Sequence, residues 1–318
     1  MIYREFGKTG VKVSVIGLGG HEFHNDGKIK GFGDNHSLAV SPGYIFPGFG
    51  MENRETLVKK ALELGINFFD LTIDSEKEAM GRVLRKLKPS QEIYLQTRPE
   101  GMVYTYDPQN RKMGDYTLLR GEVIRILNLL GRECVDILNF AFMKEALQAD
   151  EEYMDKIGDN IRRLKQEGLI RFANADTFSG EETYLKQVAS GYFDSVFINY
   201  NLVDSYMNDR LIPEASQKGM GVLCRELFRK GNLFKMAEEA GLTDRGEVAR
   251  LCIKWILSNP SVNSVVLGVS AADQLESNVS TLENISMTEG DWKTVENIMN
   301  SGLYKEEHKQ RGDRFLQG

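Results

Sequence analysis

Eight short apolar runs recur along the whole chain, and amphipathic helical patterns separate them. The runs have the length of buried strands and lie at residues 13–18, 66–69, 93–96, 135–138, 170–173, 195–198, 221–224 and 264–267. Repeated alternation of strands and helices is typical of a parallel sheet covered by helices. Eight such units predict an α/β fold, namely a closed (β/α)8 TIM barrel.

The chain has 318 residues, a length that a (β/α)8 barrel fills as one domain. Neither a charge block nor a low-complexity tract divides it, so we expect a single domain over residues 1–318. Residues 1–12 are expected to form a β-hairpin around Gly10 that closes one end of the barrel. Residues 13–285 would form the barrel, and residues 286–318 a C-terminal helix and a charged, frayed tail.

Composition limits the partners. With 40 Lys and Arg against 46 Asp and Glu, the formal charge is −6, which offers no basic field for nucleic acid. No stretch approaches the ~20 apolar residues of a membrane span, and the N-terminus lacks the apolar core of a signal peptide. Three separated cysteines show no zinc or redox spacing, so no metal site is predicted. We expect a cytoplasmic protein with a small-molecule substrate; the sequence does not indicate an oligomeric state.

Polar residues follow nearly every predicted strand. They are His21, Asp70, Arg98, Asn174, Asp176, Asn199, Asn201, Arg225, Glu226 and Ser270. Active sites of barrel enzymes lie at these C-terminal strand ends. Asp70 and Arg98 follow neighbouring strands, and a buried charge needs a partner, so we predict a close ion pair between them. The alternative interpretation is that this pair only stabilises the barrel mouth.

Collinear segments resemble the aldo/keto reductase superfamily. The similar segments are residues 3–20, 65–70, 134–138, 166–171, 199–204 and 260–278. Together they span almost the whole chain. The resemblance implies the barrel fold, a nicotinamide cofactor, either NADP or NAD, and reduction of a carbonyl by a tetrad of Asp, Tyr, Lys and His.

Only one tetrad position keeps its residue in this sequence. Asp70 matches the Asp, but the segment after it lacks the Tyr and has Ser75 at the corresponding spacing. Arg98 stands at the Lys position, and Ala141 or its neighbour Phe142 stands at the His position. An Arg stays protonated and cannot transfer the proton, although it can hold a carboxylate or phosphate. The chain is therefore identified as a divergent member with a degenerate catalytic tetrad.

A reductase without these residues needs another group that exchanges a proton near neutral pH. The options are His21 and His24 after the first strand, and Tyr104 and Tyr106 after the third. We favour His21, because it directly follows the first strand and an imidazole titrates near pH ~6.5. The candidate catalytic residues are Asp70, Arg98, His21 and Tyr104.

The resemblance also implies a cofactor site near the last strands. Ser270 is expected to begin a helix with Asp273 as its capping-box partner, so that the helix N-terminus faces a phosphate. Gln274 and Asn278 would approach the adenosine. No Lys or Arg is placed to bind the 2′-phosphate of NADP, which leaves the choice between NADP and NAD open.

At the nicotinamide end, three positions differ from the family pattern. Arg225 stands where the family stacks a Tyr on the ring, Asp176 stands where it binds the carboxamide, and Phe197 replaces a Gln. The candidate cofactor-binding residues are Gly20, Asp176, Asn199, Arg225, Gly268, Ser270, Gln274 and Asn278.

Three functions remain open at this point. The first is a divergent NAD(P)-dependent oxidoreductase that acts on a small polar or anionic carbonyl or alcohol. The second is a non-redox barrel enzyme, such as a lyase, dehydratase or isomerase, which the loss of the Tyr, Lys and His favours. The third is a non-catalytic binding or regulatory protein that keeps the barrel.

Overall fold

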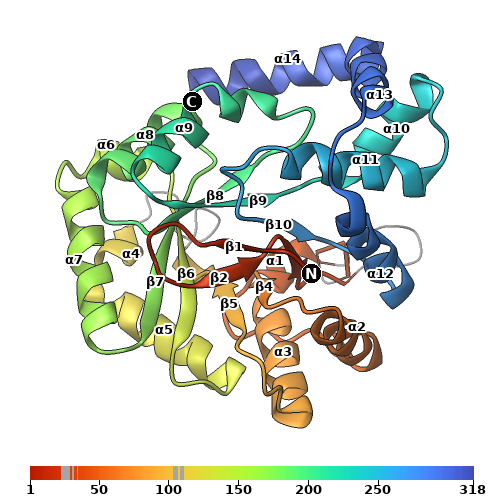
Figure 1. The fold of residues 1–318 in the computed structure, drawn as a ribbon. Helices are drawn as coiled ribbons and strands as arrows, with labels where there is room; N and C mark the ends of the chain where they lie inside the picture. The colour runs from red at the N-terminus through yellow and green to blue at the C-terminus, as the bar shows by residue number, and fades with distance from the viewer. Residues whose placement is uncertain (23–28, 31, 34, 103–106, 108–110) are drawn as a thin grey trace.

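The computed structural model describes residues 1–22, 29–30, 32–33, 35–102, 107 and 111–318 (Figure 1). In this part of the chain, parallel strands close into a barrel in the order β10-β3-β4-β5-β6-β7-β8-β9. The strands are β3 (Ile16–Gly19), β4 (Phe68–Leu71), β5 (Tyr94–Thr97), β6 (Val135–Ala141), β7 (Ile170–Asp176), β8 (Ser195–Asn199), β9 (Gly221–Arg225) and β10 (Ser264–Leu267). Each of the eight apolar runs overlaps one of these strands, which confirms the predicted TIM barrel.

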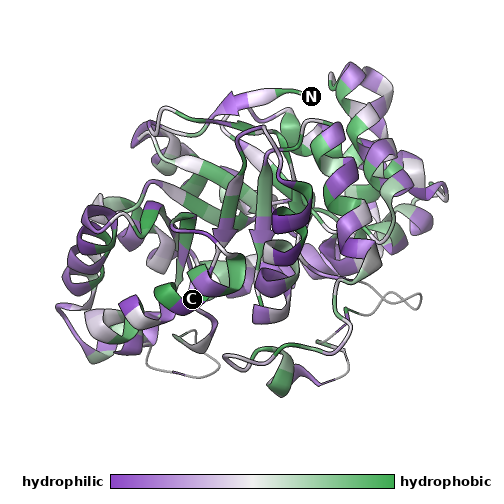
Figure 2. Cartoon of the chain, turned by 90° about the horizontal axis from the view of Figure 1, so that it is seen from below, coloured by the Kyte–Doolittle hydropathy of each residue, from purple (hydrophilic) through white to green (hydrophobic). Residues whose placement is uncertain are grey.

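Helices surround the barrel, and Figure 2 shows apolar strands enclosed by helices with hydrophilic outer faces. The helices are α1 (His36–Ala39), α2 (Glu52–Glu63), α3 (Asp74–Leu87), α4 (Arg111–Gly114), α5 (Tyr116–Leu130), α6 (Lys144–Ala149), α7 (Tyr153–Gln166), α8 (Glu181–Ser190), α9 (Leu211–Gln217), α10 (Asn232–Glu239), α11 (Arg245–Leu257), α12 (Ala272–Ser280), α13 (Glu289–Asn300) and α14 (Gly302–Gln317), with the 3₁₀ turns η1 (Glu100–Met102), η2 (Ser205–Asn208), η3 (Arg229–Gly231) and η4 (Thr281–Asn284). Among the described helices, none has the length and apolar character needed to cross a bilayer.

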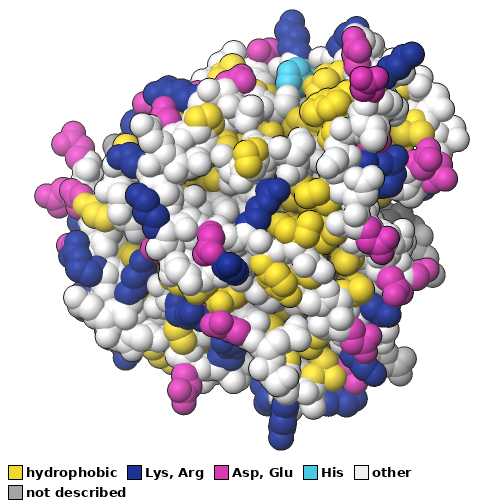
Figure 3. Space-filling model, viewed as in Figure 1, with side chains coloured by type: hydrophobic (Ala, Val, Ile, Leu, Met, Phe, Trp, Pro, Cys, Tyr) yellow, Lys and Arg dark blue, Asp and Glu magenta, His cyan; other side chains and the backbone are white. Residues whose placement is uncertain are grey.

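The N-terminal hairpin closes one end of the barrel, as predicted. Strands β1 (Tyr3–Glu5) and β2 (Lys12–Ser14) pair antiparallel, and the turn between them carries the fully buried Phe6. The Phe6 ring lies 5.9 Å from that of Phe172 in an edge-to-face arrangement. On the hairpin side of the molecule, acidic and basic side chains are interspersed (Figure 3).

The interior of the barrel has an apolar layer and a polar layer. The apolar layer next to the hairpin consists of Phe6, Val13, Phe68, Tyr94, Ile137, Phe197 and Leu223, with Phe172 packed against it. Two residues further along each strand, the side chain again points inward, because side chains alternate between the two faces. The residues at these second positions are Asp70, Gln96, Asn139, Asn174, Asn199 and Arg225. The site is therefore built on a polar layer above an apolar core.

The expectation of a frayed tail is wrong, because the segment forms α14. Ser301 caps this helix by accepting a hydrogen bond from the Tyr304 amide. Tyr304 and Phe315 are buried, and the His308 ring stacks on Tyr304 with ring centroids 5.3 Å apart. The apolar contacts of these aromatic residues hold the charged helix against α8, α10 and α13 (Figure 1).

Candidate active site

His21 lies directly after β3 and is held by two buried charged residues from neighbouring helices. Its Nδ1 lies 2.6 Å from Oε1 of Glu76, in the first turn of α3. Arg54, from α2, donates to the main-chain oxygen of Gly19 at 3.0 Å and also to that of Gly20. Both Glu76 and Arg54 are 1% exposed. The chain around His21 is thus fixed from two sides.

The packing of Glu76 explains why residue 20 is a glycine. A Cβ atom at Gly20 would collide with the carboxylate of Glu76, so only glycine leaves room for that side chain. Gly20 was predicted as a cofactor-binding residue. In the structure it lies against the group that holds His21.

The charges around His21 shift three pKa values. Burial opposes protonation of His21, but Glu76 outweighs that effect and raises the pKa of the imidazole, while Arg98 lowers it. Burial raises the pKa of Asp70 to about 6, against the effect of a hydrogen bond from Gln96. Despite its burial, Glu76 keeps a lowered pKa because His21 lies beside it. This arrangement favours the imidazolium form of His21 paired with the carboxylate form of Glu76.

The predicted ion pair between Asp70 and Arg98 is wrong. Arg98 instead donates through Nε to Glu100, two residues later, at 2.7 Å. Asp70 accepts a hydrogen bond from Gln96 Nε2 at 2.9 Å. The 3₁₀ turn η1 brings the buried Glu100 back onto Arg98 and gives the guanidinium a nearer partner. Both residues still lie close to His21, because each affects the pKa of its imidazole.

A chain of side-chain amides crosses the barrel from Asp70. Asn174 Nδ2 lies 3.3 Å from both Gln96 Oε1 and Asn139 Oδ1. Asn139 in turn donates to Asp176 Oδ2 at 3.0 Å. Buried amides of this kind are stable only when they are hydrogen bonded, and here they connect the acidic residues on opposite sides of the barrel.

Arg225 closes the far side of this layer. It donates two hydrogen bonds of 2.7 Å to the buried carboxylate of Asp176 and one of 2.8 Å to Asn199 Oδ1. Its guanidinium carbon also lies over the rings of Phe178 and Phe197, at 4.8 and 4.6 Å from their centroids. The guanidinium is therefore fixed in orientation, and with 14% of its side chain exposed it brings a permanent positive charge to the barrel mouth.

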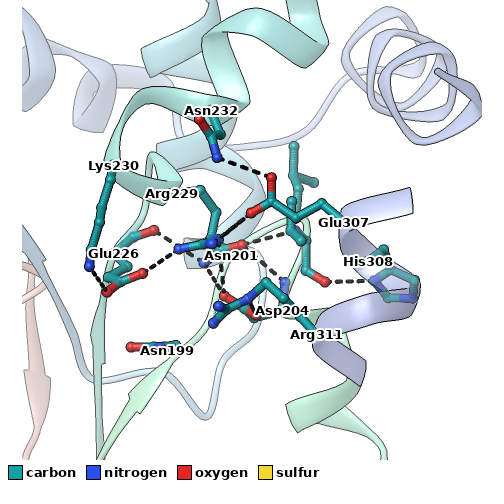
Figure 4. Close-up of polar contacts among 12 residues, drawn as sticks. Asn199, Asn201, Asp204, Glu226, Arg229, Lys230, Asn232, Glu307, His308 and Arg311 are labelled. Carbon is teal, nitrogen blue, oxygen red and sulfur yellow. Dashed lines mark hydrogen bonds and ion pairs between the residues drawn. The ribbon is translucent and has the colours of Figure 1, made fainter. Parts of the chain in front are cut away.

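The loop after β9 is strained and is tied to α14 (Figure 4). Glu226, Arg229 and Lys230 adopt left-handed backbone conformations with φ of 58°, 49° and 53°, each costing about 1–2 kcal/mol. Arg229 bonds Glu226 at 2.5 Å and Glu307 of α14 at 2.6 Å. Asn201 donates to the main-chain oxygen of Glu226 at 3.1 Å. These contacts hold the loop in its unfavourable conformation beside Arg225.

A groove of about 440 Å³ lies next to this cluster, between α10 and α14. It is lined by charged residues, but Arg229 pairs with Glu307 and Arg311 pairs with Asp204. Because these two arginines already have acidic partners, we place the candidate site at the strand ends and not in this groove.

The segment after β10 differs in detail from the expected capping box. Helix α12 begins at Ala272, and Ala271 provides no side-chain cap. Gln274 Oε1 accepts hydrogen bonds from both the amide and the hydroxyl of Ser270, at 3.0 Å each, so the predicted Ser270–Asp273 box is wrong. Gly268, Ser270 and Gln274 are exposed at this helix start, and Asn278, one turn further on, is partly buried.

Several other candidates are not in the layer. Ser75 is buried and its Oγ accepts a hydrogen bond from the Phe46 amide at 2.8 Å. Ala141 and Phe142 are buried among apolar side chains. Tyr104, Tyr106 and His24 lie outside the described residues. Within those residues, His, Cys, Asp and Glu are not grouped in a way that could hold a metal ion.

Comparison with known proteins agrees with this geometry. The model of the aldo/keto reductase family matches residues 47–245 and 232–300. The chain belongs to the aldo/keto reductase family. L-galactose dehydrogenase from Arabidopsis thaliana is 26% identical over 93% of each chain. L-glyceraldehyde 3-phosphate reductase from Escherichia coli (strain K12) is 23% identical over 91% of this chain and 89% of the relative.

The solved structures show the same fold. The holo form of aldo-keto reductase AKR11C1 from Bacillus halodurans superposes with a TM-score of 0.69 at 18% identity, covering 97% of this chain and 99% of that one. Of the residues that the sequence resemblance assigns to the tetrad positions, Asp70 lies in the polar layer, Arg98 bonds Glu100, and Ala141 and Phe142 are buried.

Aldo/keto reductases use NAD(P)H. The residues of this chain fit the phosphate end and the nicotinamide end of that cofactor to different degrees. The start of α12 could face the phosphates, because Ala271 provides no side-chain cap and the helix dipole is positive there, although Asp273 Oδ1 already accepts a hydrogen bond from the Gln274 amide at 2.9 Å. At the nicotinamide end, Asp176 already bonds Arg225 and Asn139 and contacts the Tyr184 hydroxyl. Asn199, whose Oδ1 accepts a hydrogen bond from Arg225, lies in the same polar layer of this aldo/keto reductase.

Some residues of the site were missed in the sequence. Gln96 and Asn139 follow an apolar residue of their strand by two positions, a spacing that could have identified them. Glu76 and Tyr184 come from helices, and their positions give no such signal. Tyr184 is buried beside Asp176, and burial raises its pKa well above the usual value.

Proposed function

We propose that the chain is an NAD(P)H-dependent oxidoreductase that interconverts a small polar or anionic carbonyl compound and its alcohol, with His21 as the proton donor. The observation that carries this proposal is the grouping of His21, Asp70, Arg98 and Arg225 at the mouth of an aldo/keto reductase barrel. Burial raises the pKa of Asp70, and the positive charges of His21 and Arg225 each offset part of that rise. Because such effects need proximity, an acid and two guanidinium groups border one space.

Each residue of the site has a role in the proposed reaction that follows from its chemistry. A bound reduced nicotinamide supplies the hydride. His21, whose pKa the Glu76 carboxylate raises, gives a proton to the carbonyl oxygen and regains it from water. Arg98 and Arg225 stay protonated and stabilise negative charge on the substrate. Gly268, Ser270, Gln274 and Asn278 border the α12 end, where the cofactor phosphates and adenosine would be held.

The relatives support the substrate class. Their names specify L-galactose and L-glyceraldehyde 3-phosphate, which are small, hydroxylated carbonyl compounds, the second of them anionic. The polar layer of this chain offers hydrogen bonds to hydroxyl groups, and the two arginines suit an anionic group. The segment 268–278 contains neither Lys nor Arg, so the site gives no ionic preference for NADP over NAD.

A non-redox barrel enzyme is the second candidate. It is favoured by the position of Asp176, which the family resemblance places against the carboxamide and which Arg225 here occupies with two hydrogen bonds. In this case the barrel mouth would bind substrate without a nicotinamide. A non-catalytic binding protein would share that property and would also lack turnover.

The test combines cofactor binding with turnover. NADH and NADPH are titrated by fluorescence, and a panel of small hydroxylated, phosphorylated and carboxylated carbonyl compounds is assayed with both. We expect His21→Ala to keep cofactor binding and to lose ~10²–10⁴ in rate. His36→Ala, in the nearby helix α1, is the matched control and should retain the parent rate. A parent protein that binds neither cofactor, or an unchanged rate in His21→Ala, would contradict the proposal.

A further inference from the structure

The two oxygens of Glu76 have separate partners. Oε1 lies 2.6 Å from His21 Nδ1, and Oε2 accepts a hydrogen bond from the Thr72 amide at 2.6 Å. Glu76 itself is in the first turn of α3, where the positive end of the helix dipole favours a carboxylate. The side chain is thus anchored by the backbone on one side and holds the imidazole on the other.

The contact also decides which nitrogen of His21 can react. A carboxylate accepts the hydrogen on Nδ1, so Nε2 is left as the nitrogen that can exchange a proton with another molecule. The main chain of the same residue is held as well, because Arg54 lies 3.4 Å from its carbonyl oxygen and bonds the two residues before it. Ring and backbone are both fixed, which leaves His21 little freedom to turn.

We propose that Glu76 is the positioning residue of this site, which holds His21 through Nδ1 so that Nε2 exchanges the proton with the substrate. This inference rests on the proposed role of His21. Glu76 fills the gap left by the missing Lys and Tyr of the family, since a buried carboxylate gives an imidazole the fixed orientation and charge that an acid needs.

Four charged groups face His21, from different elements. They are Glu76 on α3, Asp70 on β4, Arg98 after β5 and Arg54 on α2. Glu76 and Asp70 favour the imidazolium, whereas Arg98 opposes it. Because Glu76 alone makes direct contact with the ring nitrogen among these described groups, its removal should dominate the titration of His21.

The decisive experiment is a titration of the His21 ring by NMR in the parent and in Glu76→Gln. Loss of an adjacent opposite charge should lower the imidazole pKa by about one unit or more. The rate of carbonyl reduction falls as pH rises through the His21 pKa. In Glu76→Gln this fall should occur at a correspondingly lower pH. Glu78→Gln, on the same helix and paired with Arg82, is the matched control and should move neither curve.

If Glu76→Gln does not fold, the titration of His21 in the parent protein still tests the proposal. A His21 pKa above the ordinary 6.5 in the parent supports the contact, and a value below it overturns the proposal. A folded Glu76→Gln variant with an unmoved His21 titration overturns it too. The titration reports the contact with Glu76, whereas turnover of His21→Ala reports the proposed function, so the two can fail separately.

Discussion

Asp70 shows how the available hydrogen-bond donors set the ionisation of a buried carboxyl group. Arg98 follows the neighbouring strand β5 but bonds Glu100. Asp70 is left with the neutral amide of Gln96 as its hydrogen-bond donor. A neutral donor offsets little of the cost of burying a charge, and the pKa of Asp70 is therefore raised to about 6.

Replacing Asp70 by Asn should stabilise the protein at alkaline pH. The folded-state pKa of about 6 exceeds the ordinary 3.8, so folded protein binds the proton more tightly and loses stability as pH rises between these values. Asn keeps an oxygen for Gln96 and never ionises. Thermal unfolding should show a higher midpoint for Asp70→Asn than for the parent at pH 8, with the gap closing towards pH 4.

Exposed Asp159, paired with Arg162 on α7, provides the control for this prediction. Asp159→Asn should unfold like the parent at both pH values. A gap of the same size at pH 4 and pH 8 in Asp70→Asn would show that packing, and not the charge of Asp70, causes the difference.

The positions of the site residues could be predicted from the sequence, but their partners could not. Asp70, Asn174, Asn199 and Arg225 lie in the polar layer because strand ends bring them there, whatever the loops do. Arg98 found its partner in Glu100 because a 3₁₀ turn follows β5, and no periodicity reveals such a turn. Partners on helices, such as Glu76, depend on how the helices pack.

At the scale of elements, α14 and the loop after β9 depend on each other. The loop contains three non-glycine residues in left-handed conformations, and Glu307 of α14 bonds both Arg229 and Asn232 (Figure 4). The sequence predicted the strands well, because each is a run of apolar residues. It failed for α14, because most of residues 305–311 are charged and the aromatic residues that bury this helix lie near its ends.

Glu307→Gln should loosen this loop. The variant loses charge-assisted hydrogen bonds to a guanidinium that is 11% exposed, at a cost of about 1–3 kcal/mol. Denaturant unfolding should report that loss, and hydrogen exchange should rise in residues 226–232. The neighbouring Glu306 is exposed and bonds Gln310 within α14, so Glu306→Gln should change neither measurement. Equal effects of the two variants would contradict the role of Glu307.

At the scale of the whole molecule, the hairpin completes the core of the barrel. Phe6 is fully buried and belongs to the layer formed by the strands themselves. Beside it, Gly221 has no space for a Cβ atom because the Phe6 ring occupies that position. Eight strands therefore enclose a space that a residue from outside the barrel fills.

Phe6→Ala should destabilise the protein by about 3–5 kcal/mol, because the surrounding strands cannot move in to fill the cavity. Denaturant unfolding measures this loss. Leu118→Ala on α5, where the side chain is 49% exposed, removes a comparable apolar side chain from the surface and should cost below ~0.5 kcal/mol. A small effect of Phe6→Ala would mean that the hairpin packs on the barrel without supporting it.

The change from apolar to polar side chains within two residues of each strand sets the depth at which a molecule can be recognised. Two residues rise ~6.6 Å along a strand, or about 5 Å along the axis of a tilted barrel. Below that depth Phe197 and Leu223 leave only hydrocarbon. Residues on the strands can thus select the reacting end of a substrate. The segments that follow the strands determine which substrate lengths can bind. Preference for a head group and preference for a tail can therefore diverge separately in evolution.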